Sequence, residues 1–295
     1  MPTVRKKTVG GREYFYLQHS IRVGRKVVKR EVYLGTKIPG NLEEMKRKLL
    51  SDIYRERWYP VLEKIKEGYQ REIGRMPESL VEKERESFAI RFTYDTQRIE
   101  GSRLTLRETA DLLERNVTPS GKPVHDVIEA QAHHRIMREF DEVKDLSLST
   151  ILHWHRRLFE QTKPDIAGRI RTYQVSISGS RFTPPLPVEV YPMLREFFSW
   201  YAGNRKRTHP VELAALVHLR LVTIHPFGDG NGRVSRLAMN FVLDRNGYPM
   251  LNIPYSGRNS YYNALERSQL KNDEGIFLRW FIRRYVKEHG RYLRE

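Results

Sequence analysis

Cysteine is absent from the 295 residues of this chain, which excludes disulfide bonds, cysteine-ligated metal clusters and thiol nucleophiles. The sequence also lacks any run of about eighteen apolar residues, the length that a membrane-spanning helix needs. Its first five residues, Met-Pro-Thr-Val-Arg, have no apolar core of a secretory signal, and its last five contain no retention or lipidation motif. The lack of a membrane span, a secretory signal and an anchor motif favours a soluble protein of the cytoplasm, with no membrane as a partner, whereas the lack of cysteine does not identify the compartment.

Acidic residues are scarce relative to basic ones. There are 36 Asp and Glu against 53 Lys and Arg, which gives a formal net charge of +17. Much of this excess lies in residues 1–40, where ten basic residues accompany two acidic ones. A charge of this size suits nucleic acid, an acidic membrane surface or solubility alone, and composition does not choose among them.

Two stretches within residues 1–40 have the composition of strands. Tyr14–Leu17 and Val27–Leu34 are rich in aromatic and β-branched side chains, and Gly24 suits the first central position of a type II′ turn between them. The pattern predicts a short basic β-ribbon. Two interpretations of the ribbon stay open: contact with nucleic acid, or a solvated hairpin packed against a helical body.

Most of the remaining sequence has helical spacing and capping signals. A long helix is expected over Asn41–Ile73, and a second over 78–100, with Gly101 as its C-terminal cap. A Thr-x-x-Glu capping box at residue 105 opens a third. Further helices are expected at about 124–144, from 145 onward, and at 188–201, 210–224, 234–246 and 260–285.

Residues 165–187 interrupt the helical pattern. Gln174–Ile177 is a short alternating run bounded by glycine and proline, so we expect a small hairpin that acts as a lid or a docking edge. The predicted fold is mainly α, a helical bundle with a small β-hairpin flap preceded by the basic β-ribbon. We divide it into the ribbon at 1–40, a linking helix at 41–78 and a core at 79–295.

One stretch of nine residues concentrates the chemistry. His225–Arg233 reads His-Pro-Phe-Gly-Asp-Gly-Asn-Gly-Arg and opens a helix that carries Arg236. Its three glycines let the backbone turn its N–H groups inward, and such a nest at a helix N-terminus binds phosphates. Arg233 and Arg236 lie three residues apart and can reach one anionic ligand. Asp229 can hold a divalent cation, and His225 remains to move a proton.

These residue types suit transfer of a phosphate-containing group to a hydroxyl, and they suit hydrolysis equally. A capped loop between two packed helices would leave Asp229, Asn231 and the two arginines unexplained together. The loop is not a calcium-binding EF-hand, because Val234 occupies the position that needs glycine.

Other histidines have spacings that indicate structural roles. His133 and His134 are adjacent, and His153 and His155 are two residues apart, so neither pair shares a helix face as metal ligands would. His218 lies in an apolar run, where we expect a satisfied core residue.

The loop and the start of its helix resemble the signature of the Fic (filamentation induced by cAMP) family, His-x-Phe-x-Asp/Glu-Gly-Asn-Gly-Arg-x-x-Arg. Every fixed position is met within residues 225–236. The similarity extends over about residues 80–285, where Gly168–Thr172 and the run with Val175 and Ile177 resemble the family's flap. The resemblance implies an all-helical core and an enzyme that transfers AMP from ATP to a Ser, Thr or Tyr hydroxyl of a protein.

The resemblance also implies a role for each residue of the site. His225 would deprotonate the target hydroxyl, which attacks the α-phosphorus of ATP as pyrophosphate departs. Asp229 would hold Mg²⁺, or Mn²⁺ in its place. The nucleotide would be bound by Gly230, Asn231 and Gly232 through their N–H groups, by Arg233 on the β-phosphate, by Arg236 on the γ-phosphate, and by Tyr262, Leu265 and Gln269 around the adenine.

A second segment, Thr96–Gly101, resembles the family's inhibitory motif, Ser/Thr-x-x-x-Glu-Gly/Asn. If the carboxylate of Glu100 paired with Arg236, the guanidinium that orients the γ-phosphate would be removed, and ATP would bind only unproductively. We therefore expect an autoinhibited adenylyltransferase. The alternative is that Glu100 ends its helix paired with a surface base.

Other functions stay open at this point. The same site could remove AMP from a modified protein, with Glu100 aligning a water molecule. The chain could instead be a nucleic-acid-binding protein that uses residues 1–40, with the Fic core as a nucleotide sensor. The target protein is unknown, the chain itself is one candidate, and a homodimer is an alternative to a monomer.

Overall fold

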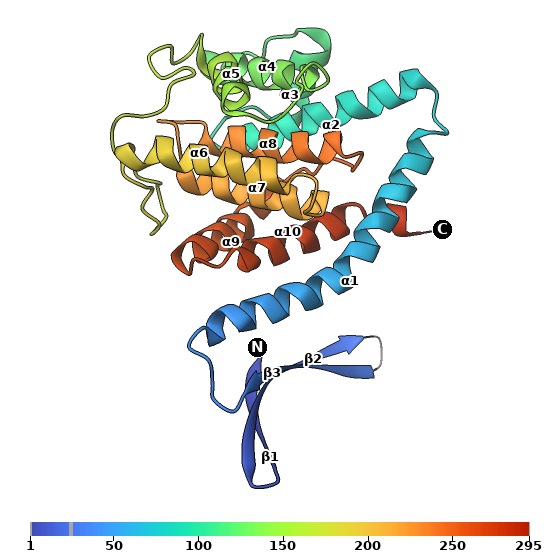
Figure 1. The fold of residues 1–295 in the computed structure, drawn as a ribbon. Helices are drawn as coiled ribbons and strands as arrows, with labels where there is room; N and C mark the ends of the chain where they lie inside the picture. Colours follow the sequence, from blue (N-terminus) through green and yellow to red (C-terminus); the bar gives the residue numbers. More distant parts are fainter. Residues whose placement is uncertain (1, 24–25, 295) are drawn as a thin grey trace. The chain divides into compact units, whose positions relative to one another are not determined.

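The computed structural model describes residues 2–23 and 26–294, and the chain divides into two compact units, residues 1–61 and 62–295. The first unit holds a three-stranded sheet and the start of a long helix, and the second is helical (Figure 1). The mainly α fold predicted from the sequence is confirmed. Within the described residues, no helix is both long and apolar enough to cross a membrane.

The first unit packs its sheet on the long helix. Leu17 pairs with Val4 on one neighbouring strand and with Val32 on the other, so all three side chains lie on one face. Leu17 is fully buried in a cluster with Leu49 and Ile53 of the helix. Burial of these apolar side chains fixes which face is covered. The elements are β1 (Thr3–Val9), β2 (Arg12–Val23) and β3 (Lys26–Gly35), antiparallel in that order, and α1 (Leu42–Ile73).

The sequence predicted β2 and β3 but missed β1. Three consecutive basic residues, Arg5–Lys7, hide the alternation of β1, and Val4 is its one half-buried side chain. Charged residues of this kind are common on edge strands, where they discourage pairing with other chains. The predicted turn at Gly24 lies outside the described residues. The expected division at residues 40 and 78 stays a prediction.

Helices form the second unit, and α6, α7 and α8 lie alongside one another at its centre (Figure 1). Almost every residue of α7 is buried, and α8 packs along it. The helices are α2 (Glu78–Ile99), α3 (Leu106–Arg115), α4 (Val124–Arg138), α5 (Leu148–Phe159), α6 (Pro187–Asn204), α7 (Pro210–Ile224), α8 (Asn231–Arg245), α9 (Arg258–Leu270) and α10 (Glu274–Glu288).

Local capping chemistry sets several of these ends as predicted. The Thr105 N–H donates to Glu108 (2.8 Å), and the Glu108 N–H donates to the Thr105 hydroxyl (3.2 Å), which completes the capping box of α3. Gly101 follows α2 with φ of 103°, a conformation that glycine adopts without strain. As a result, α2 ends with Glu100 at its C-terminus.

Two helical predictions were wrong in their extent. The single helix expected over 260–285 is divided into α9 and α10, because Asn272 adopts a left-handed φ of 46° and the Asp273 side chain accepts a hydrogen bond from the Gly275 N–H (3.0 Å). Asparagine and aspartate favour these two conformations. The helix expected to reach residue 144 ends at Arg138.

The segment before α6 does not form the expected hairpin. Residues 169–186 are all described, and no strand occurs among them. Pro184 and Pro185 have no N–H to donate to a strand partner. Their carbonyls instead accept hydrogen bonds from side chains, Pro185 from Arg171 (2.6 Å) and Pro184 from Gln174 (3.0 Å). We call residues 169–186 the flap below.

Candidate active site

The predicted loop begins where α7 ends. His225 has a left-handed φ of 53°, and its N–H donates to the Leu221 carbonyl (3.1 Å). Pro226 follows, and it has no N–H with which to continue the helix. Because α8 starts at Asn231, one short loop separates His225 from the N-terminus of the next helix.

His225 presents one basic nitrogen. Its Nδ1 lies 3.2 Å from the carbonyl oxygen of Val222. A carbonyl only accepts hydrogen bonds, so this contact places the proton on Nδ1 and leaves the lone pair on Nε2. Burial lowers the pKa of His225 below its ordinary value, and the nearby charge of Arg171 also lowers it. The ring is therefore a neutral base near pH 7.

Arg171 ties the flap to this loop. Its Nε donates to the His225 carbonyl (2.8 Å), its Nη1 donates to the Tyr173 carbonyl (3.1 Å), and its backbone N–H donates to the Pro226 carbonyl (2.9 Å). The side chain is buried. No sequence motif assigns a role to Arg171. One signal could have indicated its role. An arginine has five N–H donors, and Arg171 precedes a proline-containing segment whose carbonyls need donors other than those of a strand.

Asn231 closes the glycine loop on itself. Its side-chain oxygen accepts from the Phe227 N–H (2.9 Å), and its amide nitrogen donates to the Phe227 carbonyl (2.8 Å). Phe227 is fully buried. The first intrahelical hydrogen bond of α8 is donated by Val234 to Gly230 (3.0 Å), so the preceding N–H groups, at residues 231–233, have no carbonyl within the helix to bind.

His155 of α5 supports the same loop. The Gly168 N–H donates to its Nδ1 (2.9 Å), so Nε2 carries the proton and donates to the Asp229 carbonyl (3.1 Å). Its ring stacks on that of Phe227, with centroids 3.9 Å apart. Burial lowers the pKa of His155 to about 4. His155 thus has a structural role, as its spacing indicated.

Asp229 is surrounded by positive charge. Its Oδ2 lies 2.5 Å from Lys163 Nζ, and its Oδ1 accepts from Arg233 Nη2 (3.2 Å) and from the Gly230 N–H (2.5 Å). Burial raises the pKa of the carboxyl, but Arg233 and Lys163 outweigh burial and lower the pKa to about 2. Asp229 is therefore an anion at neutral pH. Lys163 lies beyond α5 and outside any motif, so it was not predicted from the sequence.

Arg233 is almost fully enclosed, with 3% of its surface exposed. Its Nη1 forms an ion pair with Glu129 of α4 and donates to the Gln97 side-chain oxygen (3.1 Å). Its Nη2 is the group that reaches Asp229. The guanidinium thus spans from α2 and α4 to the loop. The expected contact of Arg233 with a β-phosphate stays a prediction.

Arg236 forms the predicted ion pair with Glu100, at 2.6 Å between Nη2 and Oε1. Its Nε donates to the Thr96 hydroxyl (2.6 Å) and its Nη1 to the Tyr261 hydroxyl (3.3 Å). The side chain is 1% exposed, so the surface pair considered for Glu100 is not what forms. The carboxylate lies against the loop, because a methyl group added to Gly232 would collide with the same Glu100 oxygen.

His218 supports this arrangement from α7. Its Nε2 lies 2.8 Å from the Tyr261 hydroxyl, which accepts from Arg236 and so donates to His218. Burial lowers the pKa of His218 to about 3, which keeps the ring a neutral acceptor. His218 is therefore a buried core residue, as its apolar run predicted.

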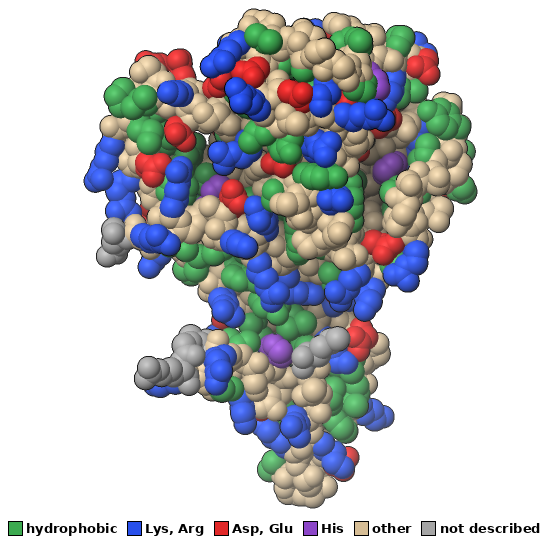
Figure 2. Space-filling view, turned by 180° about the vertical axis from the view of Figure 1, so that it is seen from behind, with side chains coloured by type: hydrophobic (Ala, Val, Ile, Leu, Met, Phe, Trp, Pro, Cys, Tyr) green, Lys and Arg blue, Asp and Glu red, His purple; other side chains and the backbone are tan. Residues whose placement is uncertain are grey.

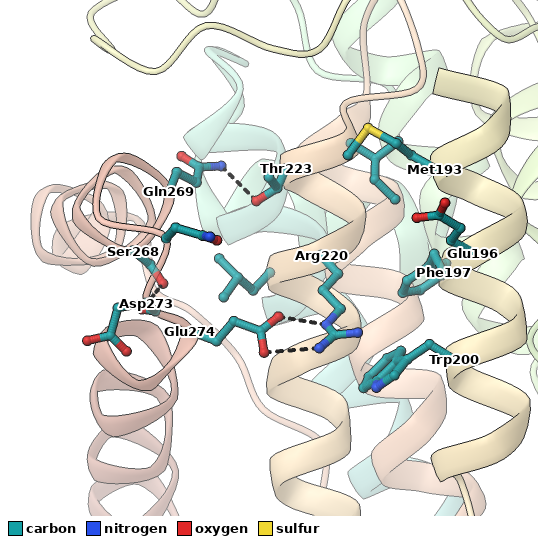
Figure 3. A pocket seen from close by; sticks show the side chains of 13 residues that line it. Met193, Glu196, Phe197, Trp200, Arg220, Thr223, Ser268, Gln269, Asp273 and Glu274 are labelled. Atoms are coloured by element: carbon teal, nitrogen blue, oxygen red, sulfur yellow. Dashed lines mark hydrogen bonds and ion pairs between the residues drawn. The ribbon is translucent and has the colours of Figure 1, made fainter. Parts of the chain in front are cut away.

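The residues expected around an adenine occupy two places. Gln269 donates to the Thr223 hydroxyl (3.1 Å), and both line a cavity of about 390 Å³ among α6, α7 and α9 (Figure 3). Tyr262 instead donates its hydroxyl to the Ile99 carbonyl (3.2 Å), and Leu265 is buried. Neither of these two lines the cavity.

Arg220 also lines this cavity, and its charge is paired. Figure 3 shows Arg220 between Trp200 and Glu274. Its Nε and Nη2 donate to the two carboxylate oxygens of Glu274 at 2.6 and 3.0 Å, and its guanidinium carbon lies 3.8 Å from the centre of the Trp200 ring. Arg220 is therefore held in place by two neighbours.

The flap is held to α9 near its turn. The Arg181 N–H and the Ser180 hydroxyl both donate to one oxygen of Glu266, at 2.6 and 3.3 Å. Val175 and Ile177, the flap residues singled out from the sequence, are half-buried. Attachment through Arg171 at one end and Glu266 at the other holds the extended segment between them.

The arrangement of the helices defines a protein of the Fic fold. Fic-1 from Caenorhabditis elegans is similar in structure with a TM-score of 0.72 and 29% identity, over 86% of this chain and 78% of that one. A Fic-domain signalling protein from Bacteroides thetaiotaomicron is similar with a TM-score of 0.71 and 25% identity, over 79% of this chain and 95% of that one.

Sequence comparison agrees. Residues 145–243 match the model of the Fic/DOC family. The protein adenylyltransferase fic-1 of C. elegans is 37% identical over 209 residues, which are 68% of this chain and 39% of that protein. The protein adenylyltransferase Fic of Drosophila melanogaster is 36% identical over 178 residues, 59% of this chain and 36% of that protein. The chain carries a Fic/DOC family domain, and it spans about two fifths of the length of these relatives.

Proposed function

We propose that this chain transfers AMP from ATP to the hydroxyl of a Ser, Thr or Tyr residue of a protein. Relatives at 36–37% identity bear the name protein adenylyltransferase. The observation that carries the proposal is the relation between His225, whose Nε2 keeps its lone pair, and the N–H groups that open α8 one loop later. A base and an anion site at this separation suit attack by a hydroxyl on a phosphate.

In the proposed reaction His225 Nε2 takes the proton of the target hydroxyl. The hydroxyl oxygen forms a bond to the α-phosphorus as the bond from that phosphorus to the pyrophosphate oxygen breaks, and pyrophosphate leaves. The N–H groups of Asn231 and Gly232, and that of Gly230 once it leaves Asp229 Oδ1, neutralise charge on the α- and β-phosphates through the N-terminal end of α8. The hydrogen bond between Nδ1 and Val222 supports the base, because it holds the tautomer.

Asp229 suits a hard divalent cation that arrives with the nucleotide. The described residues contain no group of three or more His, Cys, Asp or Glu that could hold a metal ion alone. Mg²⁺ needs only one or two carboxylates when substrate phosphates complete its shell. Asp229 remains ionised, and the ammonium of Lys163 already lies against its Oδ2 as a cation would. When bound, Mg²⁺ or Mn²⁺ would supply charge neutralisation for the departing phosphates.

Arg233 has a narrower role in this proposal. Its Nη1 is engaged by Glu129 and Gln97, and its Nη2 donates to Asp229. Contact with a β-phosphate would require the guanidinium to leave part of this buried pairing, which is costly. We assign Arg233 the positioning of Asp229, with the β-phosphate as a partner only at the Nη2 edge.

Glu100 is the inhibitory residue of the proposal. It occupies Nη2 of Arg236, the group needed by a γ-phosphate, and its carboxylate lies against Gly232, where phosphate oxygens would approach. The negative charge of Glu100 repels the nucleotide there, and the ion pair also withholds the guanidinium of Arg236 from the γ-phosphate. The support is the buried ion pair at 2.6 Å.

The adenine and the target segment are assigned to separate edges of the site. We place the adenine along α9, which carries Tyr262, Leu265 and Gln269; Gln269 opens onto the cavity beside Thr223, and Tyr262 lies against Ile99. We assign the target segment to the flap at Val175 and Ile177. The support is that the flap is extended and has no strand partner in the part of the chain described.

The test compares wild type, Glu100→Gly and the double variant Glu100→Gly/His225→Ala, incubated with Mg²⁺ and ATP labelled at the α-phosphate. We expect Glu100→Gly to raise incorporation into the chain itself by about ten- to hundredfold, the range for loss of a charged hydrogen bond. The double variant should incorporate none while still binding ATP by calorimetry. Unchanged incorporation in Glu100→Gly would contradict inhibition, and retained transfer in the double variant would show that another base acts.

Two further arms address the alternatives. Labelled CTP, GTP and UTP test which nucleotide base the site accepts, and mass spectrometry locates the modified hydroxyl. A protein already carrying AMP tests the reverse direction: release of AMP by wild type, in the absence of transfer by Glu100→Gly, would assign the chain to removal instead. Whether the chain is a homodimer stays a prediction that light scattering decides.

A further inference from the structure

The sheet of the first unit has a face that its own core does not use. Side chains alternate along each strand, and Leu17 packs with its cross-strand partner Val4 against the Leu49 and Ile53 side chains of α1. The opposite face therefore carries the intervening residues. Three of them are tyrosines: Tyr14 and Tyr16 on β2 and Tyr33 on β3, with Tyr16 and Tyr33 directly paired.

The tyrosines form one aromatic group on this face. The ring centroids of Tyr16 and Tyr33 are 5.3 Å apart, and those of Tyr14 and Tyr33 are 6.3 Å apart. Tyr33 is 53% exposed, a large fraction for an aromatic ring in a sheet. Exposed aromatic rings on a sheet face offer flat surfaces to another π system.

Basic side chains surround these rings on the same face. The register pairs Arg5 with Tyr16, Lys7 with Tyr14 and Lys29 with Ser20, so the three cations point to the tyrosine side. Arg12 and Arg22 have the same parity on β2 as the tyrosines, and all five cations are exposed. In Figure 2 many Lys and Arg side chains, drawn in blue, are exposed on the sheet-bearing unit at the bottom of the view.

One acidic residue, Glu31, shares this face and accounts for one of the cations. Lys7 Nζ lies 2.8 Å from a Glu31 oxygen and 4.3 Å from the centre of the Tyr16 ring. The other four cations have no acidic partner among the described residues. The face is therefore a group of aromatic rings with a net positive border.

We propose that this face binds single-stranded nucleic acid, with the tyrosine rings stacking on unpaired bases and the four unpaired cations on the phosphates. We call it the tyrosine face. Stacking platforms surrounded by Lys and Arg are what single strands require, since every base has a π face and every nucleotide a negative charge. A duplex keeps its bases stacked on one another, so it would use the cations and leave the rings unused.

Two adjacent lysines of β1 provide a matched pair of variants. Lys7 and Lys6 are neighbours, both are exposed and both have a glutamate partner, Glu31 for Lys7 and Glu13 for Lys6 (2.6 Å). Strand alternation places Lys7 on the tyrosine face and Lys6 on the opposite one. Lys7→Ala and Lys6→Ala therefore remove the same charge from opposite faces.

The experiment measures the fluorescence anisotropy of labelled twelve-nucleotide dT and rU strands with the full chain. Four phosphate contacts predict that raising salt from 50 to 200 mM weakens binding roughly fiftyfold. Tyr33→Ala should weaken binding roughly tenfold, the cost of one lost stack, and Tyr33→Phe should not. Lys7→Ala should weaken binding more than Lys6→Ala, because it leaves the Glu31 carboxylate without its partner on the tyrosine face, where that charge repels the phosphates. Thermal unfolding of each variant verifies that the sheet remains folded.

Several results would overturn the proposal. Equal losses for Lys6→Ala and Lys7→Ala would indicate diffuse charge attraction with no preferred face. Unchanged binding by Tyr33→Ala would remove the stacking role. Tighter binding of a twelve-base-pair duplex than of either strand would assign the face to double helices. Displacement of the strand by polyglutamate as effectively as by unlabelled dT would indicate an acidic protein as the occupant.

Discussion

The ammonium of Lys163 lies 2.5 Å from Oδ2 of Asp229, on the carboxylate assigned to the divalent cation. A metal ion bound to this oxygen would lie close to the ammonium, and the two positive charges would repel each other. The structure thus couples the position of Lys163 to binding of the cation, and Lys163 is 38% exposed, so it has room to move aside.

Replacement of Lys163 by Met should therefore tighten binding of the cation. The competing ammonium is lost and the carboxylate stays ionised through Arg233, so we expect the dissociation constant of Mn²⁺ to fall by about two- to fivefold, the range for a partly exposed ion pair. Electron paramagnetic resonance of free Mn²⁺, with a non-hydrolysable ATP analogue present, measures it. Lys144→Met, at an exposed lysine before α5, is the control. Weaker Mn²⁺ binding by Lys163→Met would show that Lys163 supports the cation instead.

The rate of AMP transfer should depend on pH through His225. The base acts only when neutral, and burial lowers its pKa below 6.5. In the Glu100→Gly background the rate should be constant from pH 7 to 9 and decrease toward acid, with a midpoint below 6.5. Asp229, with a pKa of about 2, stays ionised over this range. A rate that does not decrease toward acid, with ATP binding unchanged, would exclude His225 as the base.

Stability should decrease in mild acid because of His155. Its pKa is about 4 in the folded chain and 6.5 when exposed, so between these values the unfolded chain binds the extra proton and is favoured as pH falls. Stability from this group is complete above pH 6.5, and roughly 2 kcal/mol of it is lost by pH 5. Urea unfolding at pH 7 and pH 5 measures the loss. His155→Gln should lose that much less between the two values; an equal loss in both proteins would contradict the assignment.

Two glycines of the loop should respond differently to alanine. Gly230 has φ of 76°, and an added methyl group would collide with the Phe159 ring, so Gly230→Ala should destabilise folding by about 2–4 kcal/mol. At Gly232 the methyl group meets the carboxylate end of Glu100 and the guanidinium end of Arg236, and ends of long side chains shift at less cost than a packed ring. Gly232→Ala should therefore fold nearly as well and bind ATP more weakly, because the methyl group takes the space of a phosphate. Urea unfolding and calorimetry separate the two effects.

Local signals made much of the fold predictable. The Thr105 box, Gly101 and the break after His225 are set by hydrogen bonds within a few residues, so the sequence alone indicates them. The pair of Glu100 and Arg236 is distant in sequence. It was predictable only because the resemblance to a family connected two motifs.

Contacts between distant segments could not be predicted in the same way. Lys163 and Arg171 lie in irregular segments without periodicity, and their partners are backbone carbonyls or a carboxylate elsewhere in the chain. The enclosure of Arg233 by Glu129 depends on how α4 packs, which no pattern around residue 129 indicates. The flap does not form the predicted hairpin, because side-chain donors satisfy its carbonyls. Strand propensity does not describe such an arrangement.

The two hydrogen bonds between Asn231 and Phe227 have a kinetic consequence. They fix the loop in the folded chain before any nucleotide arrives, so the conformational entropy of the loop is lost during folding and not during association. Association of ATP should then need no ordering of the loop, and its rate should approach that of a preformed site. The lifetime of the complex is left to depend on whether Arg236 is free to hold the terminal phosphate.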